Sequence, residues 1–411
     1  MAKRILFVDD EPLVLAGLER SLHGMRKDWE MVFVTSGQAA LEAMNAQSFE
    51  IVVTDMRMPG MDGAQLLEEV KKRSPQSLRM ILSGQSDRET ILRSVNPTHQ
   101  YLSKPCEGEE LRGRLMRAFA LKDLLENPEV KGLVSKLDSL PSLPALYFQL
   151  TEELQQPEPS LAKVAKLISA DIAMTAKVLQ LVNSAFFGLR CEVSKAYHAV
   201  ELLGTDIVRA LVLSTHVFSK FETDLLSESD VQHLWQHSLA SGSYAKRIAV
   251  LEHCSQHLVD DCFTAALLHD AGKLIMAYAL RDQYKKVIEL VRNEGKGMSD
   301  AEREVFGCGH AEIGAYLFGL WNLPASIIEA VAWHHQPASS LQAGFSAVAA
   351  VHVASIYHEQ KAQHWMKDTT VIDYDFLSRI GCKEHEAMWR KVLEGEEPQG
   401  AEDERQDPVR G

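Results

Sequence analysis

The sequence predicts an α/β domain built on a five-stranded parallel sheet, followed by an all-α domain. A chain of 411 residues is long enough for two or three domains. Its first 105 residues alternate short apolar runs with amphipathic stretches, an order typical of parallel strands joined by helices. Beyond Val130 the apolar residues recur every three or four positions, which is the spacing of helices that bury one face.

The five strands are expected where apolar runs end in turn residues. Helical patterns lie between successive strands, and a last one covers about 108–125. Residues 1–122 are therefore assigned to the α/β domain. The expected strands are 4–8, 31–34, 51–54, 79–82 and 100–102.

A helical connector at 123–136 is expected to join the two domains. Its pattern is interrupted at Asn127-Pro128, because proline cannot continue a helix. The all-α domain, with a C-terminal helical extension, then covers 137–393. Residues 394–411 are rich in acidic side chains and are expected to form a disordered tail.

Composition and charge exclude several classes of protein. The net charge of -14 would repel nucleic-acid phosphates and anionic membrane surfaces. No apolar stretch approaches about 18 residues and no signal-peptide core follows the first residues, so we expect a cytoplasmic protein without a membrane partner. The 6 cysteines form no Cys-x-x-Cys pair, which favours reduced, buried thiols over a disulfide framework.

Polar side chains follow the predicted strands where the strands end. Asp9 and Asp10 follow the first strand, Asp55 the third, Ser83 the fourth and Lys104 the fifth. The carboxyl ends of parallel strands meet at one edge of a sheet, so these residues should converge there. Three carboxylates repel one another unless a hard cation joins them, and Mg²⁺ fits such a site. Asp55 could then attack a phosphoryl group, while Lys104 and Ser83 cover the charge on its oxygens.

Taken singly, these aspartates would be turn or cap residues and Lys104 a solvated lysine. The whole set, however, closely resembles the receiver domain of two-component response regulators. The motifs are DD at 9 and 10, DMRMPGMDG from Asp55, SG at 83 and 84, and YLSKP from Tyr101.

The resemblance implies a flavodoxin-like fold in which Asp55 is the phosphoacceptor. It also implies that Asp9, Asp10 and Asp55 hold Mg²⁺ together with the backbone carbonyl of Arg57. Further, it implies that phosphorylation is reported by Ser83, Lys104 and Tyr101. The stretch SDRETILRSVNPTHQ is more polar than the usual fourth helix of the family, so we expect this domain to use an interface of its own.

A second set of chemically active residues lies in the helical part, which carries most of the 16 histidines. Imidazoles and a carboxylate on successive helices are how a helical bundle assembles a hydrolytic metal centre. The set resembles the HD phosphohydrolase superfamily, although Ser355 stands where the late aspartate of that superfamily belongs. Lys273 matches a phosphate-holding lysine, but the Gly-Tyr-Pro motif of cyclic di-GMP phosphodiesterases is missing. The candidates are His237, His269, Asp270, His310, His334 and His335.

The upstream half of this domain resembles HDOD domains, which are HD-related output domains without proven hydrolysis. The resemblance runs from about Leu137 to Pro337 and includes LPSLP, the Asn183-Ser184 pair and the Leu203-Gly204 turn. Two interpretations remain open for the histidines: a buried hydrogen-bonded set that is structural or holds a divalent metal without turnover, or a working metal centre. His352, on a helix of small residues, is expected to be a satisfied core residue.

The expected function is that of a phosphorelay response regulator. Asp55 would accept a phosphoryl group from a sensor histidine kinase or phosphotransfer protein, and the receiver would catalyse its own phosphorylation and dephosphorylation. The HDOD domain would then act through protein or nucleotide-signal interactions, with a homodimer as one of the expected partners, no turnover of an external substrate and no direct DNA binding. The alternative is a receiver-gated, metal-dependent HD phosphohydrolase acting on cyclic di-GMP.

Overall fold

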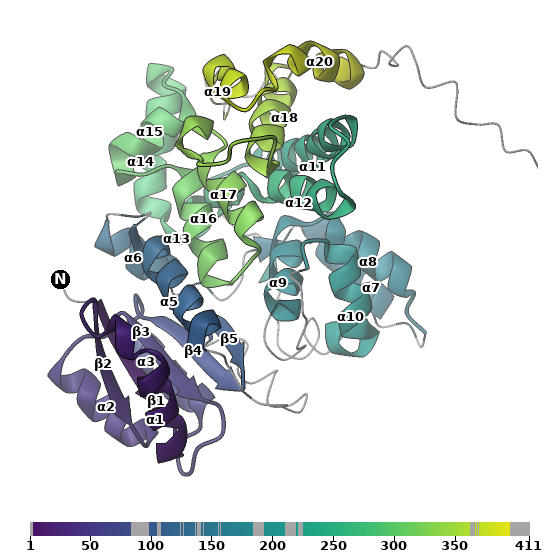
Figure 1. The fold of residues 1–411 in the computed structure, drawn as a ribbon. Coiled ribbons are helices and arrows are strands. Elements are labelled where there is room, and N and C mark those ends of the chain that lie inside the picture. Colours follow the sequence, from purple (N-terminus) through teal and green to yellow (C-terminus); the bar gives the residue numbers. More distant parts are fainter. Residues whose placement is uncertain are drawn as a thin grey trace, which may run out of the picture.

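The structure is a computed structural model in which two bodies, one built on a sheet and one on helices, lie against each other (Figure 1). None of the described helices combines the length and the apolar composition that crossing a bilayer requires. The described residues are 3–83, 98–104, 108–123, 125, 127–135, 137, 141–142, 144–154, 156, 158–183, 193–209, 219–220, 225–361, 366, 368 and 370–394.

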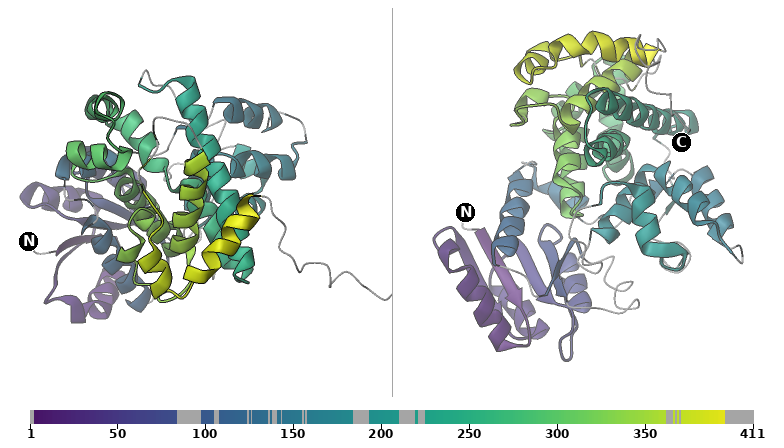
Figure 2. Two further views of the ribbon diagram at one scale, coloured as in Figure 1. Left: turned by 90° about the horizontal axis from the view of Figure 1, so that it is seen from above. Right: turned by 45° about the vertical axis from the view of Figure 1, so that its right-hand side comes forward.

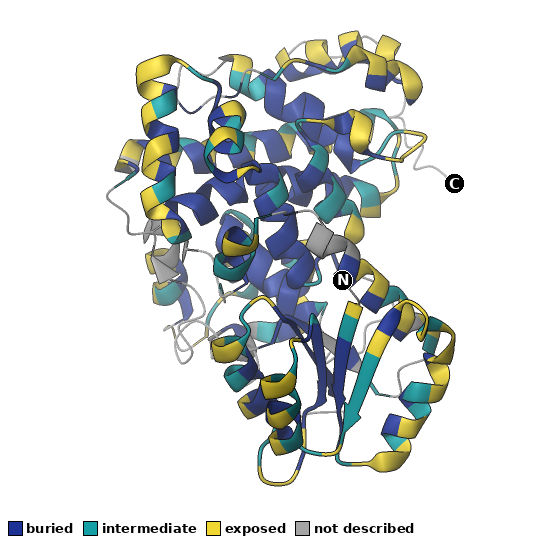
Figure 3. Cartoon of the chain, turned by 90° about the vertical axis from the view of Figure 1, so that its left-hand side faces the viewer, coloured by how far each residue is buried: buried dark blue, intermediate teal, exposed yellow. Residues whose placement is uncertain are grey.

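The N-terminal body is a sheet of five parallel strands in the order β2-β1-β3-β4-β5, counted over the described residues. All five predicted strands are confirmed to within one or two residues at each end. The central strands β1 and β3 are almost wholly buried, as expected of strands covered on both faces (Figure 3). The strands are β1 Lys3–Val8, β2 Trp29–Val34, β3 Ile51–Asp55, β4 Leu78–Ser83 and β5 Gln100–Ser103.

Helices cover the two faces of this sheet. Leu6 and Val8 of β1 point into a core shared with α2 (Gly37–Ala46) and α3 (Gly63–Arg73). Ile5 and Phe7 point the other way, toward α1 (Pro12–Ser21), the short 3-10 turn η1 (His23–Met25) and α5 (Gly108–Asp123). The polar stretch that departs from the family's fourth helix falls at 84–97 and lies outside the described residues.

A broken helix connects the two bodies, as predicted. After α5, a second helix α6 (Pro128–Val134) begins at Asn127, whose side chain accepts hydrogen bonds from the backbone of Glu129 and Val130. Proline suits the first turn because the missing N–H has no helical partner there. Figure 2 shows α5 and α6 between the sheet and the green helices of the second body.

The C-terminal body is mostly helical, as predicted, with one exception. Pro141–Ser142 (β6) and Ser219–Lys220 (β7) form a short parallel pair of strands. These strands are too short to be predicted from the sequence. The first helices are α7 Pro144–Leu154, α8 Leu161–Ser169, α9 Ile172–Val182, α10 Ala196–Arg209, α11 Glu228–Leu251 and α12 Gln256–Leu268. Then come α13 Ala271–Ala279, α14 Arg281–Glu294, α15 Met298–Phe306, α16 His310–Leu320, α17 Ala325–Trp333, η4 Pro337–Ser339, α18 Ala347–Lys361, α19 Tyr374–Arg379, η5 Lys383–His385 and α20 Glu386–Glu394.

The sheet and the helical body contact each other through α16. The Gln100 side chain at the start of β5 donates a hydrogen bond of 2.9 Å to the backbone oxygen of Gly319, near the end of α16. Arg114 of α5 donates to the side-chain oxygen of Asn322 at 3.0 Å. The core on the α5 side of the sheet continues without interruption into the helical body. The two bodies therefore share apolar packing as well as polar contacts.

A buried polar network ties the connector into the same interface. Arg79 of β4 is fully buried, and its guanidinium donates to the backbone oxygen of Ser135 at 3.1 Å. One ring nitrogen of His99 lies 2.6 Å from this guanidinium. The hydroxyls of Ser135 and Tyr316, on α16, are 3.1 Å apart. Because burying such groups is costly unless they are hydrogen-bonded, this network holds the sheet, the connector and α16 in one arrangement.

Candidate functional site

An acidic pocket lies at the carboxyl edge of the sheet. Asp9 follows β1 and Asp55 ends β3, and both carboxylates are buried. The Lys104 ammonium, just after β5, donates to Asp9 Oδ2 at 2.7 Å and also to Asp55 Oδ1. Burial opposes the charge on Lys104, but the hydrogen bonds that it donates to Asp55 and Asp9 outweigh burial and raise its pKa. Three strand ends thus bring together the residues expected to meet.

The loop after β3 has a backbone that only particular residues permit. A Cβ on Gly63 would lie 2.2 Å from the backbone oxygen of Asp55, so glycine is required for α3 to start this close to the strand. The Asp62 side chain caps α3 by accepting from the backbone N–H of Gln65 at 2.8 Å. The backbone N–H of Arg57 donates to Asp55 Oδ2 at 2.6 Å, which fixes the orientation of this carboxylate.

The remaining candidates of this pocket are placed only in part. Asp10 follows Asp9 and is partly exposed. Ser83 ends β4 opposite Ser103, and Tyr101 lies in β5 opposite Ile81, but the side chains of Ser83 and Tyr101 are outside the described residues. The carboxylates offer the hard oxygen ligands that Mg²⁺ prefers, and Lys104 supplies one positive charge against their excess.

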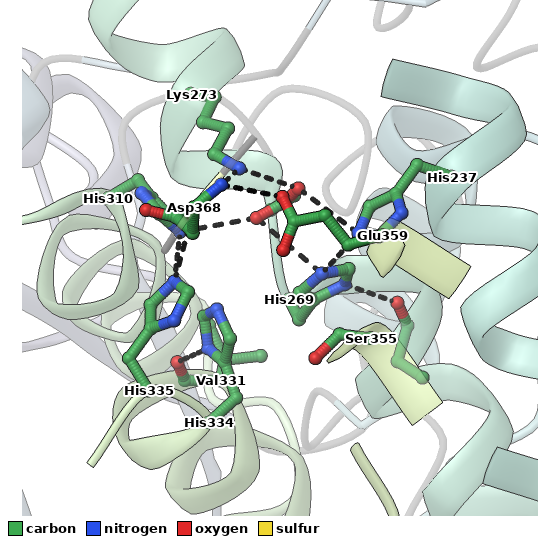
Figure 4. Close-up of polar contacts among 12 residues, drawn as sticks. His237, His269, Lys273, His310, Val331, His334, His335, Ser355, Glu359 and Asp368 are labelled. Atoms are coloured by element: carbon green, nitrogen blue, oxygen red, sulfur yellow. Dashed lines mark hydrogen bonds and ion pairs between the residues drawn. The ribbon is translucent and has the colours of Figure 1, made fainter. Parts of the chain in front are cut away.

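The histidines of the second candidate set converge in the helical body, as Figure 4 shows. His237 belongs to α11, His269 and Asp270 lie at the junction of α12 and α13, and His310 opens α16. Within each of two groups of three residues, the possible ligand atoms lie within 4.8 Å of one another, and every member except His335 is buried. These groups are His237, His269 and Asp270, and His310, His334 and His335.

Asp270 lies at the centre of the set. Its Oδ1 is 3.2 Å from His310 Nε2 and 3.5 Å from His269 Nε2, and its Oδ2 is 3.7 Å from His237 Nε2. Asp270 Oδ1 and His334 Nε2 are nevertheless buried without a hydrogen-bond partner among the described residues. Unsatisfied buried acceptors are costly, so atoms of this kind fit a divalent metal.

A close crossing of α13 and α16 brings Asp270 to His310. A Cβ on Gly272 would lie 1.9 Å from the backbone oxygen of His310, and one on Gly314 would lie 3.3 Å from the backbone nitrogen of Gly272. The two helix backbones can therefore approach only because these positions lack side chains. The spacing of the histidines in the sequence gives no hint of this crossing.

Two buried acidic residues of the site were missed by sequence reasoning. Glu302 of α15 accepts from the backbone N–H of His310 at 2.8 Å and lies 2.6 Å from its Nδ1. Asp368, after α18, accepts from the backbone and the hydroxyl of Ser299 at 2.7 and 2.6 Å. Its other oxygen is 3.5 Å from His335 Nε2. The folding of the chain brings each of these residues into the site, and neither belongs to a sequence motif.

Lys273 supplies a positive charge from inside the site. Its ammonium donates to Asp270 Oδ2 at 3.0 Å and to Asp368 Oδ2 at 3.3 Å, and its side chain is buried. Burial works against this charge, but the two carboxylates outweigh burial and raise the pKa of Lys273 well above its usual value. The site therefore contains a cation of its own between two of its carboxylates.

The imidazoles differ in charge. Burial holds the pKa of His237, His269 and His334 below the usual value and lowers that of His335 to about 3, so these rings are neutral and able to bind a metal. Burial also opposes charge on His310, but Glu302 and Asp270 raise the pKa of His310 to about 10. The His310 ring is therefore the one that the surrounding carboxylates keep protonated.

Ser355 and His352 lie on α18 and form hydrogen bonds with the backbone. The Ser355 hydroxyl donates to the backbone oxygen of His352 at 3.2 Å, so it does not replace a carboxylate ligand. His352 is buried, with Nδ1 2.7 Å from the backbone oxygen of His334 and Nε2 2.9 Å from the backbone nitrogen of Asp373. The prediction that His352 is a satisfied core residue is confirmed.

A cavity of about 590 Å³ opens beside His335 and Asp368. Its wall includes one arginine and four aspartates, of which Asp368 reaches the histidine set. A wall of this charge attracts cations and repels anions. The other charged lining residues are Asp300, Arg303, Asp373 and Asp375.

A lysine-bridged acidic pocket thus lies on a parallel sheet, and the helical body that follows contains a histidine set. Two family models match: the response regulator receiver domain over residues 5–116 and the HDOD domain over residues 140–337. The chain therefore joins a response regulator receiver domain to an HDOD domain.

Individual relatives match one part of the chain each. An uncharacterised protein of Treponema pallidum is 28% identical over 207 residues, covering 50% of this chain and 39% of that protein. The hydrogenase transcriptional regulatory protein HoxA of Cupriavidus necator is 31% identical over 122 residues, covering 29% and 25%. The chain thus spans about two fifths of the first relative and a quarter of the second.

Solved structures also match. The MmoQ response regulator of Methylococcus capsulatus is 22% identical, covers 61% of this chain and 98% of its own, and has a TM-score of 0.47. An HDOD domain protein of unknown function from Geobacter sulfurreducens is 24% identical, covers 68% and 89%, and has a TM-score of 0.35.

Proposed function

We propose that Asp55 accepts a phosphoryl group from a sensor histidine kinase or a phosphotransfer protein, and that this controls the HDOD domain. The observation that supports this most is the contact of Lys104 with both Asp9 and Asp55 at the carboxyl edge of the sheet. In the transfer, an oxygen of Asp55 forms a bond to phosphorus as the bond from phosphorus to the donor imidazole breaks, and that imidazole leaves.

The pocket residues divide the work of this reaction. The backbone N–H of Arg57 holds the Asp55 carboxylate in one orientation, and Lys104 stabilises negative charge on the transferred oxygens. Receiver domains generally bind Mg²⁺, and here Asp9, Asp10 and Asp55 would hold it together with the backbone carbonyl of Arg57. The ion would neutralise the carboxylates and the incoming phosphoryl oxygens.

We infer that one strand and one helix carry the signal to the HDOD domain. Strand β5 ends next to Lys104 in the pocket and begins at Gln100, which is hydrogen-bonded to Gly319 of α16. At its other end α16 begins with His310, inside the histidine set. One strand and one helix thus join the phosphorylation pocket to the histidine set, and we propose that phosphorylation changes the HDOD domain through them.

The HDOD domain would act by binding a protein or a nucleotide signal. Lys273 already provides a cation between Asp270 and Asp368, which lowers the need for a metal there. The acidic wall of the adjoining cavity would repel a phosphodiester. The first observation favours an output domain without turnover, and the second favours a protein over a nucleotide as the partner bound at this cavity.

A second candidate is a metal-dependent phosphohydrolase gated by Asp55. It is favoured by Asp270 Oδ1 and His334 Nε2, which are buried without hydrogen-bond partners among the described residues. A bound divalent metal would activate water for attack on phosphorus, and these atoms would be among its ligands. Turnover of cyclic di-GMP with Mn²⁺, Fe²⁺ or Mg²⁺ that is abolished by His269→Ala and by Asp270→Ala would establish this candidate over the first.

A labelling experiment tests the phosphoacceptor. A small radiolabelled phosphodonor with Mg²⁺ should label the wild type and leave Asp55→Asn unlabelled. Asp62→Asn is a matched control, because Asp62 caps α3 outside the pocket and an amide can still cap a helix. Equal labelling of Asp55→Asn and the wild type would refute the assignment.

A further inference from the structure

A third group of metal-binding side chains lies away from both sites. Its members are Glu252, which caps the C-terminal end of α11, and Cys382 and His385 at the two ends of the η5 turn. One potential ligand atom from each lies within 4.8 Å of those of the other two. The group thus joins the C-terminal extension, α19 to α20, to a helix more than a hundred positions earlier in the chain.

The chain folds locally so that Cys382 and His385 face the same neighbour. Gly381 has φ of 76°, a left-handed conformation that ends α19 and reverses the chain. The backbone N–H of Cys382 then donates to Leu377 at 2.8 Å. Residues three positions apart in a helical turn lie on one side, so the thiol and the imidazole both reach Glu252.

Contacts among the side chains orient the donors. His385 Nδ1 lies 2.9 and 3.1 Å from the two carboxylate oxygens of Glu252, and Trp389 Nε1 donates to Glu252 Oε1 at 2.9 Å. The Cys382 thiol has only a weak contact, 3.6 Å from the backbone oxygen of Ile380. The imidazole is half exposed while the thiol is buried, so an ion could enter from solvent on the histidine side.

The chemistry of this donor set is that of zinc. A thiolate, an imidazole and a carboxylate are the ligand types that Zn²⁺ takes in tetrahedral sites. A divalent cation bound here displaces the thiol proton and balances the negative charges of the thiolate and of Glu252.

We propose that Glu252, Cys382 and His385 form a binding site for a zinc-class divalent metal that fastens the C-terminal extension to α11. The thiol of Cys254, two residues after Glu252, affects Cys382 electrostatically but does not belong to the group. The histidine set of the helical body is a separate group, and neither of its two clusters contains a cysteine.

Cobalt tests this site selectively, since only a cysteine ligand gives the ultraviolet charge-transfer band from thiolate to Co²⁺. The full chain, freed of metal and kept reduced, should develop this band with about one equivalent of Co²⁺, and Zn²⁺ should abolish it. Cys382→Ser should eliminate the band. Glu252→Gln should weaken Co²⁺ binding at least about tenfold. Cys308→Ser is the matched control, because Cys308 is also buried but belongs to none of the three groups among the described residues.

Thermal unfolding of each variant without metal shows whether it is folded. Folded wild-type protein that gives no band, or a band that survives in folded Cys382→Ser, would overturn the proposal. The first result would leave these residues as a metal-free hydrogen-bonded anchor. The second would place the thiolate ligand elsewhere in the chain.

Discussion

Replacing Lys273 by methionine tests whether this lysine is the internal cation of the histidine set. Methionine keeps most of the apolar length of the side chain and removes the charge. The change leaves Asp270 and Asp368 without the ammonium that lies 3.0 and 3.3 Å from them. Removing one partner of a buried ion pair typically costs about 3–5 kcal/mol, because the remaining charges stay buried.

The expected loss is large enough to measure by calorimetry. For a domain of this size about 1 kcal/mol lowers Tm by roughly 2–4 °C, so Lys273→Met should lower Tm by about 6–20 °C in protein treated with a chelator. Lys285→Met is the control, since Lys285 is an exposed lysine on α14 and its loss should change stability by less than about 0.5 kcal/mol.

The sign of the pH dependence follows from the carboxylates. Burial opposes their ionisation, but the neighbouring cations hold the pKa of Asp270 and of Asp368 below the usual value. A carboxyl with a lowered pKa stabilises the fold above its unfolded pKa and loses this effect as pH falls through the folded pKa. The deficit of Lys273→Met should therefore be greatest near neutral pH and shrink on acidification.

A double-mutant cycle separates charge from packing. Combining Lys273→Met with Asp368→Asn should cost less than the sum of the two single changes, because the second removes a charge that the first left unpaired. Strict additivity, or a Lys273→Met protein within about 1 °C of the wild type, would refute the role of Lys273 as internal cation.

Two further changes test the surroundings of the histidine set. Burial raises the pKa of Glu359 to about 7, so its contribution to the stability of the fold is present at low pH and is lost as pH rises toward 7. Glu359→Gln still accepts from the backbone N–H of Asp368, and it should stabilise the fold by about 2 kcal/mol at pH 8 but not at pH 4.5. Equal differences in Tm at the two pH values would contradict this. Gly272→Ala should lower the free energy of unfolding by at least about 3 kcal/mol, because its Cβ would meet the His310 backbone. Gly17→Ala has open space around it and should leave stability unchanged or increase it. Denaturant unfolding measures both, and similar effects would show that the crossing of α13 and α16 is loose.

The receiver pocket was predictable because its residues follow strands. Once five parallel strands are expected, the residues after them must meet at one edge, and Asp9, Asp55 and Lys104 do. The strands were predictable for a related reason, since Ile51 to Asp55 are all buried and begin with a continuous apolar run, Ile51 to Val53.

The rest of the site depends on contacts between helices, which short-range patterns do not encode. Glu302 lies in MSDAEREVF, where it looks like one of several exposed charges, yet it is fully buried against His310. Asp368 reaches the site from beyond α18, and Cys382 was interpreted only as a buried thiol although it lies beside Glu252 and His385. Asp368 and Cys382 were hidden because their partners are distant in sequence, and Glu302 was hidden because its partner His310 begins the next helix.

Hydrogen exchange measures directly whether phosphorylation at Asp55 reaches the histidine set, as we propose. Full-length protein with Mg²⁺ should be compared with and without beryllofluoride, which mimics the acyl phosphate. We predict altered exchange in α16, His310–Leu320, that is absent in Asp55→Asn and reduced in Gln100→Ala, which loses the hydrogen bond to Gly319. Altered exchange around Asp55 with α16 unchanged in the wild type would contradict the claim.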